Sequence, residues 1–189
     1  MIPKPRDWDT AQAYTGDVER MTPGGHIVKI MNARMDMSKN GRPMLVVSFD
    51  ICEGSPLDGF YRRKHDSRKN AGFTTGWGGV IRFMLYANDG TSTNGFFKGF
   101  ITSVEESNPG YQFNWDERSL ADKLVGLVFG EEEYLGNDGK PHTSVKAQQA
   151  RSVEAIRAGV PVPPAKKLNA ESVKPAQGFA EVEDDELPF

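Results

Sequence analysis

The segment between Phe60 and Tyr86 concentrates positively charged and aromatic side chains. Its cations are Arg62, Arg63, Lys64, Arg68, Lys69 and Arg82, with His65 among them, and its rings include Tyr61, Phe73, Trp77 and Phe83. A protein that binds single-stranded nucleic acid needs cations along the phosphates and exposed rings on which bases stack. The segment therefore predicts a single-strand binding surface. A solvated strand and loop with core aromatics would have the same composition.

Trp77 is the strongest stacking candidate in that segment. It lies between Gly76 and the pair Gly78-Gly79. A large ring in a flexible, glycine-rich loop is poorly explained by packing, so we expect Trp77 to be exposed and to stack on a base. Phe83 and Tyr86 fit a position in the core equally well.

Four further cations lie in the predicted first and last strands. Lys29 and Arg34 belong to the first, and Lys146 and Arg151 to the last. In an oligonucleotide-binding barrel the four side chains could line one groove. Ordinary surface charge explains each of them equally well.

The end of the chain has a different chemistry. Five of the 26 acids and none of the 23 bases lie beyond Lys174, so residues 1–174 carry a net charge of +2 and the remainder −5. An acidic run is usually a solvated tail. This one ends in an apolar plug and a free carboxylate, which a basic pocket on a partner protein could bind. The predicted partner-binding residues are Asp184, Asp185, Glu186, Leu187, Pro188 and Phe189.

The composition favours a folded protein of the cytosol. Hydrophobic residues make up 38% of the 189 residues, and Cys52 is the only cysteine, so no disulfide is expected within the chain. The N-terminus lacks the apolar run of a signal peptide. Gly72 to Gly79 lacks the Gly-Lys-Ser/Thr ending of a phosphate-binding loop, and the three histidines are scattered. We therefore predict no catalysis, no metal and no cofactor.

Alternation and turn residues predict five strands. They cover Gly25–Met37, Met44–Cys52, Gly59–Lys64, Leu124–Tyr134 and Thr143–Arg151, with a hairpin turn at Asn40-Gly41. Helical spacing predicts a helix over 96–104 and shorter helical segments over 116–123 and 152–158. An apolar island at Val80–Tyr86 stays unassigned.

This order of elements predicts a mainly β fold, a five-stranded OB-fold barrel with a helix and an insertion between strands 3 and 4. The domain plan has an N-terminal arm (1–21), the barrel (22–158), a disordered linker (159–180) and the acidic tip (181–189).

The tip is similar to the acidic C-terminal peptide of bacterial single-stranded DNA-binding proteins, which ends in acids, an aliphatic residue, Pro and Phe. The body resembles phage-encoded members of that family. The resembling stretches are Phe96–Ile101 to Ser107–Tyr111, Lys123–Val128 to Glu131–Tyr134, and Arg151–Ile156. The resemblance implies an OB-fold and sequence-independent binding of single-stranded DNA. It also implies recruitment of replication, recombination and repair proteins through the tip, in the cytoplasm of a bacterial host. Residues 65–93 depart from the simple bacterial barrel.

Two other functions stay open at this point. Carboxylates such as Asp50, Glu53 and Asp58 could hold magnesium in a small phage nuclease or recombination enzyme. The chain could instead be an adaptor that acts through its tail alone. The sequence leaves open whether the protein forms a homo-oligomer and whether it prefers DNA to RNA.

Overall fold

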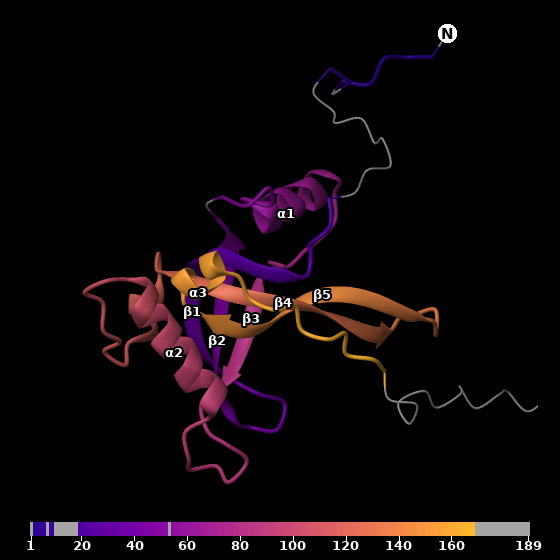
Figure 1. The fold of residues 1–189 in the computed structure, drawn as a ribbon. Helices are drawn as coiled ribbons and strands as arrows, with labels where there is room; N and C mark the ends of the chain where they lie inside the picture. Colours follow the sequence, from indigo (N-terminus) through magenta and orange to yellow (C-terminus); the bar gives the residue numbers. More distant parts are fainter. Residues whose placement is uncertain (1, 7, 10–18, 53, 169–189) are drawn as a thin grey trace, which may run out of the picture.

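The computed structural model describes residues 2–6, 8–9, 19–52 and 54–168, and a five-stranded antiparallel sheet forms its centre (Figure 1). The strands are β1 (Gly24–Met37), β2 (Pro43–Ile51), β3 (Val80–Met84), β4 (Leu124–Leu135) and β5 (Pro141–Arg151). Their order across the sheet is β3-β2-β1-β4-β5, so β1 pairs with both β2 and β4. The prediction of a mainly β fold with five strands is confirmed. The predicted tip lies outside the described residues.

β1 and β2 form the predicted hairpin. The backbone N–H of Gly41 donates to the carbonyl of Ser38 at 2.9 Å, and Gly41 adopts a φ of 69°, which glycine accepts without strain. The inward residues of β2 are buried as predicted: Leu45, Val47, Phe49 and Ile51. The opposite face of β2 is more buried than predicted, since Met44 and Val46 are also buried.

The prediction of the third strand was wrong. Residues 60–64 begin helix α1 (Phe60–Asn70) instead of a strand. The carboxylate of Asp50 accepts hydrogen bonds from the backbone N–H groups of Tyr61 and Arg62, so it caps a helix that has no cap in its own N-cap residue. A cap supplied from eleven positions away leaves no local sequence signal. The actual third strand, β3, lies in the apolar island, so the extra segment lies between strands 2 and 3 and not between 3 and 4.

The predicted helical segments are present. They are α2 (Gly95–Ser107), the 3₁₀ helix η1 (Glu117–Leu120) and α3 (Val153–Ala158). α2 begins after Asn94, whose side chain accepts hydrogen bonds from the N–H groups of Phe96 and Phe97. α3 begins after Ser152, which caps it in the same way. η1 covers four of the eight residues predicted there.

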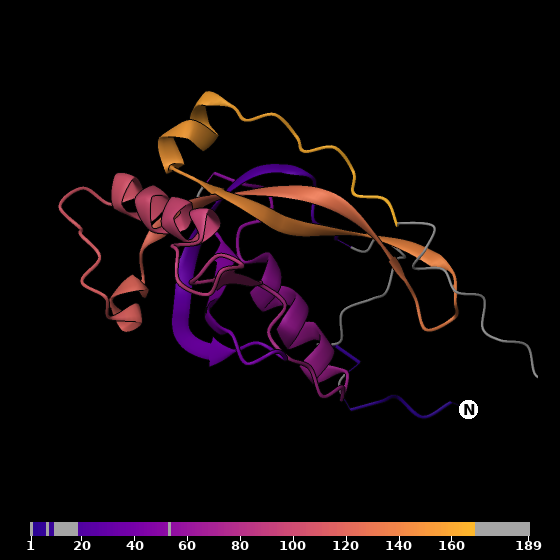
Figure 2. The same cartoon turned by 90° about the horizontal axis from the view of Figure 1, so that it is seen from below.

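The core lies between α2 and the inward face of the sheet. The ring of Phe100 in α2 stacks on Phe83 of β3 with centroids 4.5 Å apart. Phe49 of β2 meets Phe129 of β4 edge to face, with centroids 6.1 Å apart. Figures 1 and 2 show α1 away from α2, at a different side of the sheet. α1 packs on the core through its buried residue Phe60, and Tyr61 packs against the same cluster.

The β4–β5 hairpin continues beyond the other strands as a two-stranded ribbon (Figure 2). The pairing of β1 with β4 ends at Phe129. Lys166 then takes over the same edge, because its N–H donates to the carbonyl of Glu131 at 2.9 Å and its carbonyl accepts from the N–H of Glu133 at 2.8 Å. The start of the predicted disordered linker is thus an extended segment along β4. Residues 169–180 lie outside the described part of the chain.

Candidate nucleic-acid interface

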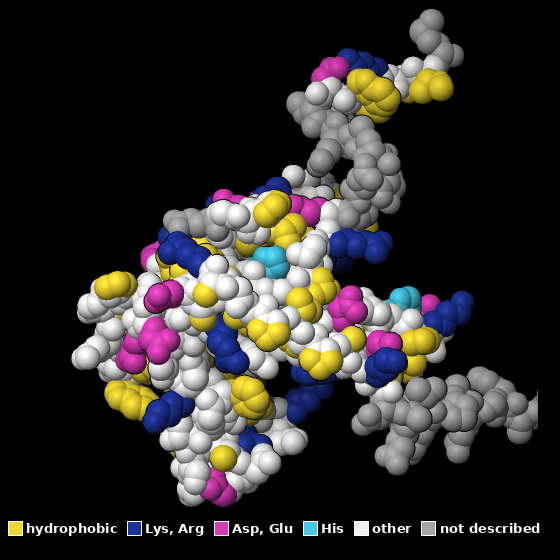
Figure 3. Space-filling model, in the orientation of Figure 1, with side chains coloured by type: hydrophobic (Ala, Val, Ile, Leu, Met, Phe, Trp, Pro, Cys, Tyr) yellow, Lys and Arg dark blue, Asp and Glu magenta, His cyan; other side chains and the backbone are white. Residues whose placement is uncertain are grey.

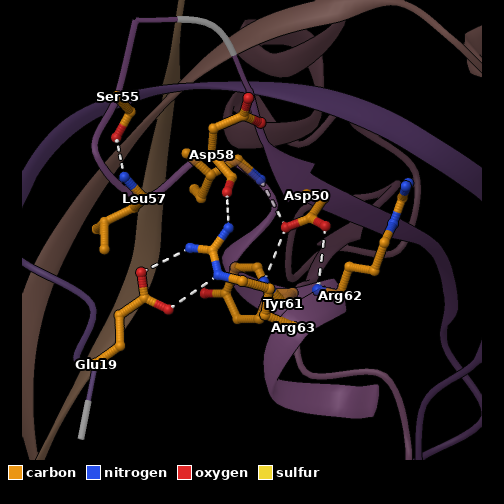
Figure 4. A network of polar contacts seen from close by, with 9 residues as sticks. Glu19, Asp50, Ser55, Leu57, Asp58, Tyr61, Arg62 and Arg63 are labelled. Carbon is orange, nitrogen blue, oxygen red and sulfur yellow. Dashed lines mark hydrogen bonds and ion pairs between the residues drawn. The ribbon is translucent and has the colours of Figure 1, made fainter. Parts of the chain in front are cut away.

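Asp50 determines where α1 begins. Its side chain is 4% exposed, and its two carboxylate oxygens accept hydrogen bonds from Ile51, Tyr61 and Arg62 at 2.9–3.1 Å (Figure 4). Both oxygens therefore accept hydrogen bonds from backbone N–H groups. Glu53 lies outside the described residues. Within the described residues no group of three or more His, Cys, Asp or Glu side chains could hold a metal ion.

Arg63 connects α1 to the N-terminal segment. Its guanidinium pairs with the carboxylate of Glu19 at 2.6 Å and donates to the backbone carbonyl of Asp58 (Figure 4). These contacts occupy the side chain in the absence of any ligand. Arg63 is therefore a predicted DNA-binding cation whose charge the fold itself uses.

The other cations of α1 keep their charge available. Arg62, Arg68 and Lys69 are exposed, and in the described part of the chain none of them forms an ion pair. The ammonium of Lys64 lies 5.6 Å from the centroid of the Phe60 ring, in cation–π range. α1 therefore presents several charges that no described acid neutralises.

The outward face of β1, β2 and β3 adds two more arginines. In the strand register Arg34 and Arg82 lie on either side of Val46, which is 3% exposed. Long cationic side chains can cover an apolar neighbour with their stems and keep their heads in water. Arg34 pairs with Asp36 at 3.2 Å, while Arg82 is exposed. This row extends the basic surface from α1 onto the sheet.

Lys29 lies on the same face, opposite Asp50 in the register. Its ammonium pairs with Asp122 at 2.8 Å, and this hydrogen bond lowers the pKa of the Asp122 carboxyl. The hydrogen bond and the charge of Asp122 raise the pKa of Lys29, and the nearby charge of Arg62 offsets a small part of this rise. The structure therefore brings Lys29 next to the first turn of α1, although its charge is partly neutralised.

Tyr61 and Trp77 are held by packing. Tyr61 meets Phe49 edge to face at 5.5 Å, and its burial raises the pKa of the phenol. A Cβ at Gly79 would lie 2.8 Å from the Tyr61 ring and 2.2 Å from the Phe49 carbonyl oxygen, so the glycine permits this close approach. The packed ring of Tyr61 therefore offers little free face to a base.

Trp77 is half-buried, contrary to the expectation of a free ring. Its Nε1–H donates to the Phe49 carbonyl at 2.9 Å, and its ring lies 5.7 Å from that of His65. Packing thus explains why a large ring occurs among glycines. Phe73, in contrast, is 62% exposed and remains available for stacking, whereas Phe83 is in the core.

The two cations of β5 lie apart from α1. β4 separates β5 from β1 in the sheet. Lys146 pairs with Glu132 at 3.3 Å on the ribbon. Arg151, at the end of β5, lines a pocket beside α2. The sequence prediction named Arg151 but missed the pocket and its exposed ring, Phe96. Helical spacing could have predicted that Phe96 is exposed. Phe97, Phe100 and Val104 form the buried stripe of α2, and Phe96 lies outside that stripe.

The surface in Figure 3 shows how the charges are distributed. Lys and Arg side chains form separate patches on this face, with Asp and Glu side chains near several of them. No helix of the described residues is long and apolar enough to cross a membrane. Comparison of the chain with protein-family models and with curated proteins gives no match.

Proposed function

We propose that this protein binds single-stranded DNA without sequence preference and without catalysis, through α1 and the outward face of β1, β2 and β3. The observation that carries the proposal is the group of exposed cations on α1 that no described acid neutralises, beside the exposed ring of Phe73. Cations follow the phosphates of a single strand, and a free aromatic face accepts a base.

The position of the charges in α1 supports a ligand role. The first turn of a helix carries partial positive charge, so cations there reduce the stability of the helix. α1 has no acidic residue in its first turn, while Arg62, Arg63 and Lys64 follow its first two residues. Local rules are often broken at functional sites, where a ligand compensates for the cost. The carboxylate of Asp50 offsets part of this repulsion from β2, and a bound phosphate would offset more of it.

We also propose that the sheet is an OB-fold. Its five antiparallel strands, the pairing of β1 with both β2 and β4, and the position of α2 between β3 and β4 agree with that architecture. α2 contacts β3, β4 and β5, so it spans the region between the two edge strands. The outward face of β1–β3 would then be the surface that OB-folds use for oligonucleotides.

A titration of dT oligomers against the full chain tests the binding proposal. With four to six phosphate contacts, log affinity should fall with log salt at a slope of roughly −3 to −4. Matched duplex DNA should bind more weakly. A slope near zero, or equal affinity for duplex, contradicts the proposal. Magnesium-dependent cleavage of the oligomer would favour the nuclease instead.

The second part of the proposal is that the acidic tip recruits replication and recombination proteins. Its acids and the terminal Leu187-Pro188-Phe189 carry this part, which stands on sequence alone. Phe189→Ala removes the plug and keeps every charge. Pull-downs from bacterial lysate should lose their partners with this variant, while its DNA affinity stays within twofold of the unmodified chain. Capture of the same partners by both proteins would leave the tip a solubilising tail.

A further inference from the structure

A surface pocket lies beside α2. Its volume is about 590 Å³, within the range of small-molecule sites. Three elements supply its walls: the loop after β3, the first half of α2 and the end of β5. The lining residues used below are Asn88, Gly95, Phe96, Gly99, Gln149 and Arg151. None of the exposed cations of α1 contributes to it.

Two glycines of α2 line this pocket. Gly95 and Gly99 are four residues apart, so they lie on the same face of the helix. A Cβ at either position would meet nothing within 4 Å, and neither has a positive φ. Close packing and backbone conformation therefore give no reason for a glycine, and glycine inside a helix lowers its stability. Open space beside the helix is the property that the two residues share.

The loop after β3, which forms the wall opposite α2, is held by hydrogen bonds within the protein. Arg42, from the β1–β2 hairpin, donates to the carbonyls of Tyr86 and Ala87 and to Oδ1 of Asn88, at 2.8–3.3 Å. Asp89 accepts hydrogen bonds from Ser92 and Thr91, which lower the pKa of its carboxyl to about 2. The loop is thus held by a network of its own and needs no ligand to form.

Three kinds of chemistry meet in the pocket. Arg151 donates to the Ala150 carbonyl and to Gln149, and within the described chain no acid pairs with its guanidinium, whose remaining N–H groups suit a phosphate. The ring of Phe96 is 67% exposed and offers a face for stacking. The side-chain amides of Asn88 and Gln149 can both donate and accept, as a base edge requires.

We propose that this pocket binds one nucleoside monophosphate unit, with its phosphate on Arg151 and its base against Phe96. The unit is either a nucleotide of the bound single strand or a free nucleotide. The first source rests on the proposed DNA-binding function. It is also the one that the topology favours, because Arg82 and Met84 of β3 and the exposed Tyr86 lead from the proposed DNA surface to the loop at Asn88.

Amide spectra of the full chain, titrated separately with thymidine 5′-monophosphate and with a long dT oligomer, test the site. Saturable shifts of the Gly95, Phe96 and Gly99 amides are expected. Shifts with the oligomer at concentrations where the mononucleotide gives none identify the strand as the source. Shifts with the mononucleotide in a chain that does not bind the oligomer support the pocket and contradict the DNA-binding function. No shift of these amides with either probe overturns the proposal, even if α1 amides respond to the oligomer.

Two matched pairs of variants make the test specific. Gly99→Leu should fill the pocket, abolish the shifts of its neighbours and weaken oligomer binding about tenfold, the loss of one stacked base. Thr102→Leu places the same side chain on an exposed site of α2 outside the pocket and should change neither. Arg151→Gln should weaken binding of the probe severalfold, whereas Arg157→Gln, on α3, should not. An unchanged thermal midpoint shows that each variant folds, and unchanged binding by Gly99→Leu overturns the proposal.

Discussion

Helix α1 and the β4–β5 ribbon use charge in different ways. On the ribbon, Lys146 pairs with Glu132, and His142 lies 2.9 Å from Asp138. On α1, Arg62, Arg68 and Lys69 are exposed without an ion pair to any described acid. A cation with an acidic partner adds little to binding, because a phosphate must first displace that partner. We therefore expect α1 to attract a polyanion more strongly than the ribbon does.

The two regions also differ in how they are held. Backbone hydrogen bonds run along both edges of β4, to β5 on one side and to β1 and Lys166 on the other. α1 depends on a few side chains, chiefly Asp50 at its start and Arg63 with Glu19. Single substitutions should therefore disturb α1 more than the ribbon, and the following predictions test this difference.

Asp50→Ala should have the largest effect. It removes the side-chain acceptor of two backbone N–H groups at the start of α1, those of Tyr61 and Arg62, and of the Ile51 N–H at the end of β2. We expect the free energy of unfolding to fall by about 2–5 kcal/mol, because buried donors without partners carry a large desolvation penalty. Urea denaturation measures this. Asp138→Ala on the ribbon is the control, since its carboxylate is exposed, and an equal loss in both variants would contradict the comparison.

Neutralising α1 should have the next largest effect, on DNA binding rather than stability. The triple variant Arg62→Gln, Arg68→Gln, Lys69→Gln should flatten the slope of log affinity against log salt by about 2, at about 0.7 per phosphate contact. The matched control removes three charges from the ribbon region: Lys140→Gln, Lys146→Gln, Lys166→Gln. Its slope should stay close to that of the unmodified chain. Equal flattening by both would mean that only net charge matters.

Trp77 and Phe73 should also differ in role, the first in stability and the second in DNA binding. Trp77→Phe should lower the free energy of unfolding by about 1 kcal/mol, because the hydrogen bond from Nε1 to Phe49 is lost. Phe73→Ala should leave stability unchanged and weaken binding of dT oligomers by about 1–3 kcal/mol, the range for one stacked base. Thermal denaturation and oligomer titration of both variants separate the two roles. If only the Trp77 variant binds the oligomer more weakly, the sequence prediction that Trp77 stacks on a base would be supported instead.

The sequence predicts those parts of the fold that local patterns encode. The strand pattern of β2, the turn at Asn40-Gly41 and the helical stripe of α2 each lie within one short segment. The structure confirms the strand, the turn and the helix, although both faces of β2 are buried. α1 was missed because its cap, Asp50, belongs to a strand already assigned. A run of cations carries no periodicity that separates a helix from a strand, so residues 59–64 could not be assigned from their own types.

The candidate site, like the fold, depends partly on contacts between residues that are distant in the chain. Residue types identify the cations, but not which of them the fold neutralises. Arg62 and Arg63 are adjacent and chemically identical in the sequence, yet among the described residues only the guanidinium of Arg63 forms an ion pair with a carboxylate. Trp77 and Phe73 are both predicted to bind DNA, and the hydrogen bond from Trp77 to a backbone carbonyl of β2 accounts for their different exposure. Such partners are distant in the chain, so only the three-dimensional arrangement shows them.

The pair Arg62 and Arg63 gives the smallest and sharpest test. Arg62→Gln should reduce the salt slope by about 0.7, the value of one phosphate contact. Arg63→Gln should leave the slope nearly unchanged and lower the free energy of unfolding by at most ~1 kcal/mol, as expected for an exposed ion pair. The two variants have the same net charge and differ by one position, so a difference in slope reports the ion pair with Glu19 alone. Equal slopes would mean that DNA displaces Glu19 from Arg63 on binding. Glu19→Gln then distinguishes the two cases, because it should raise the affinity of a chain in which Glu19 competes with phosphate and leave it unchanged otherwise.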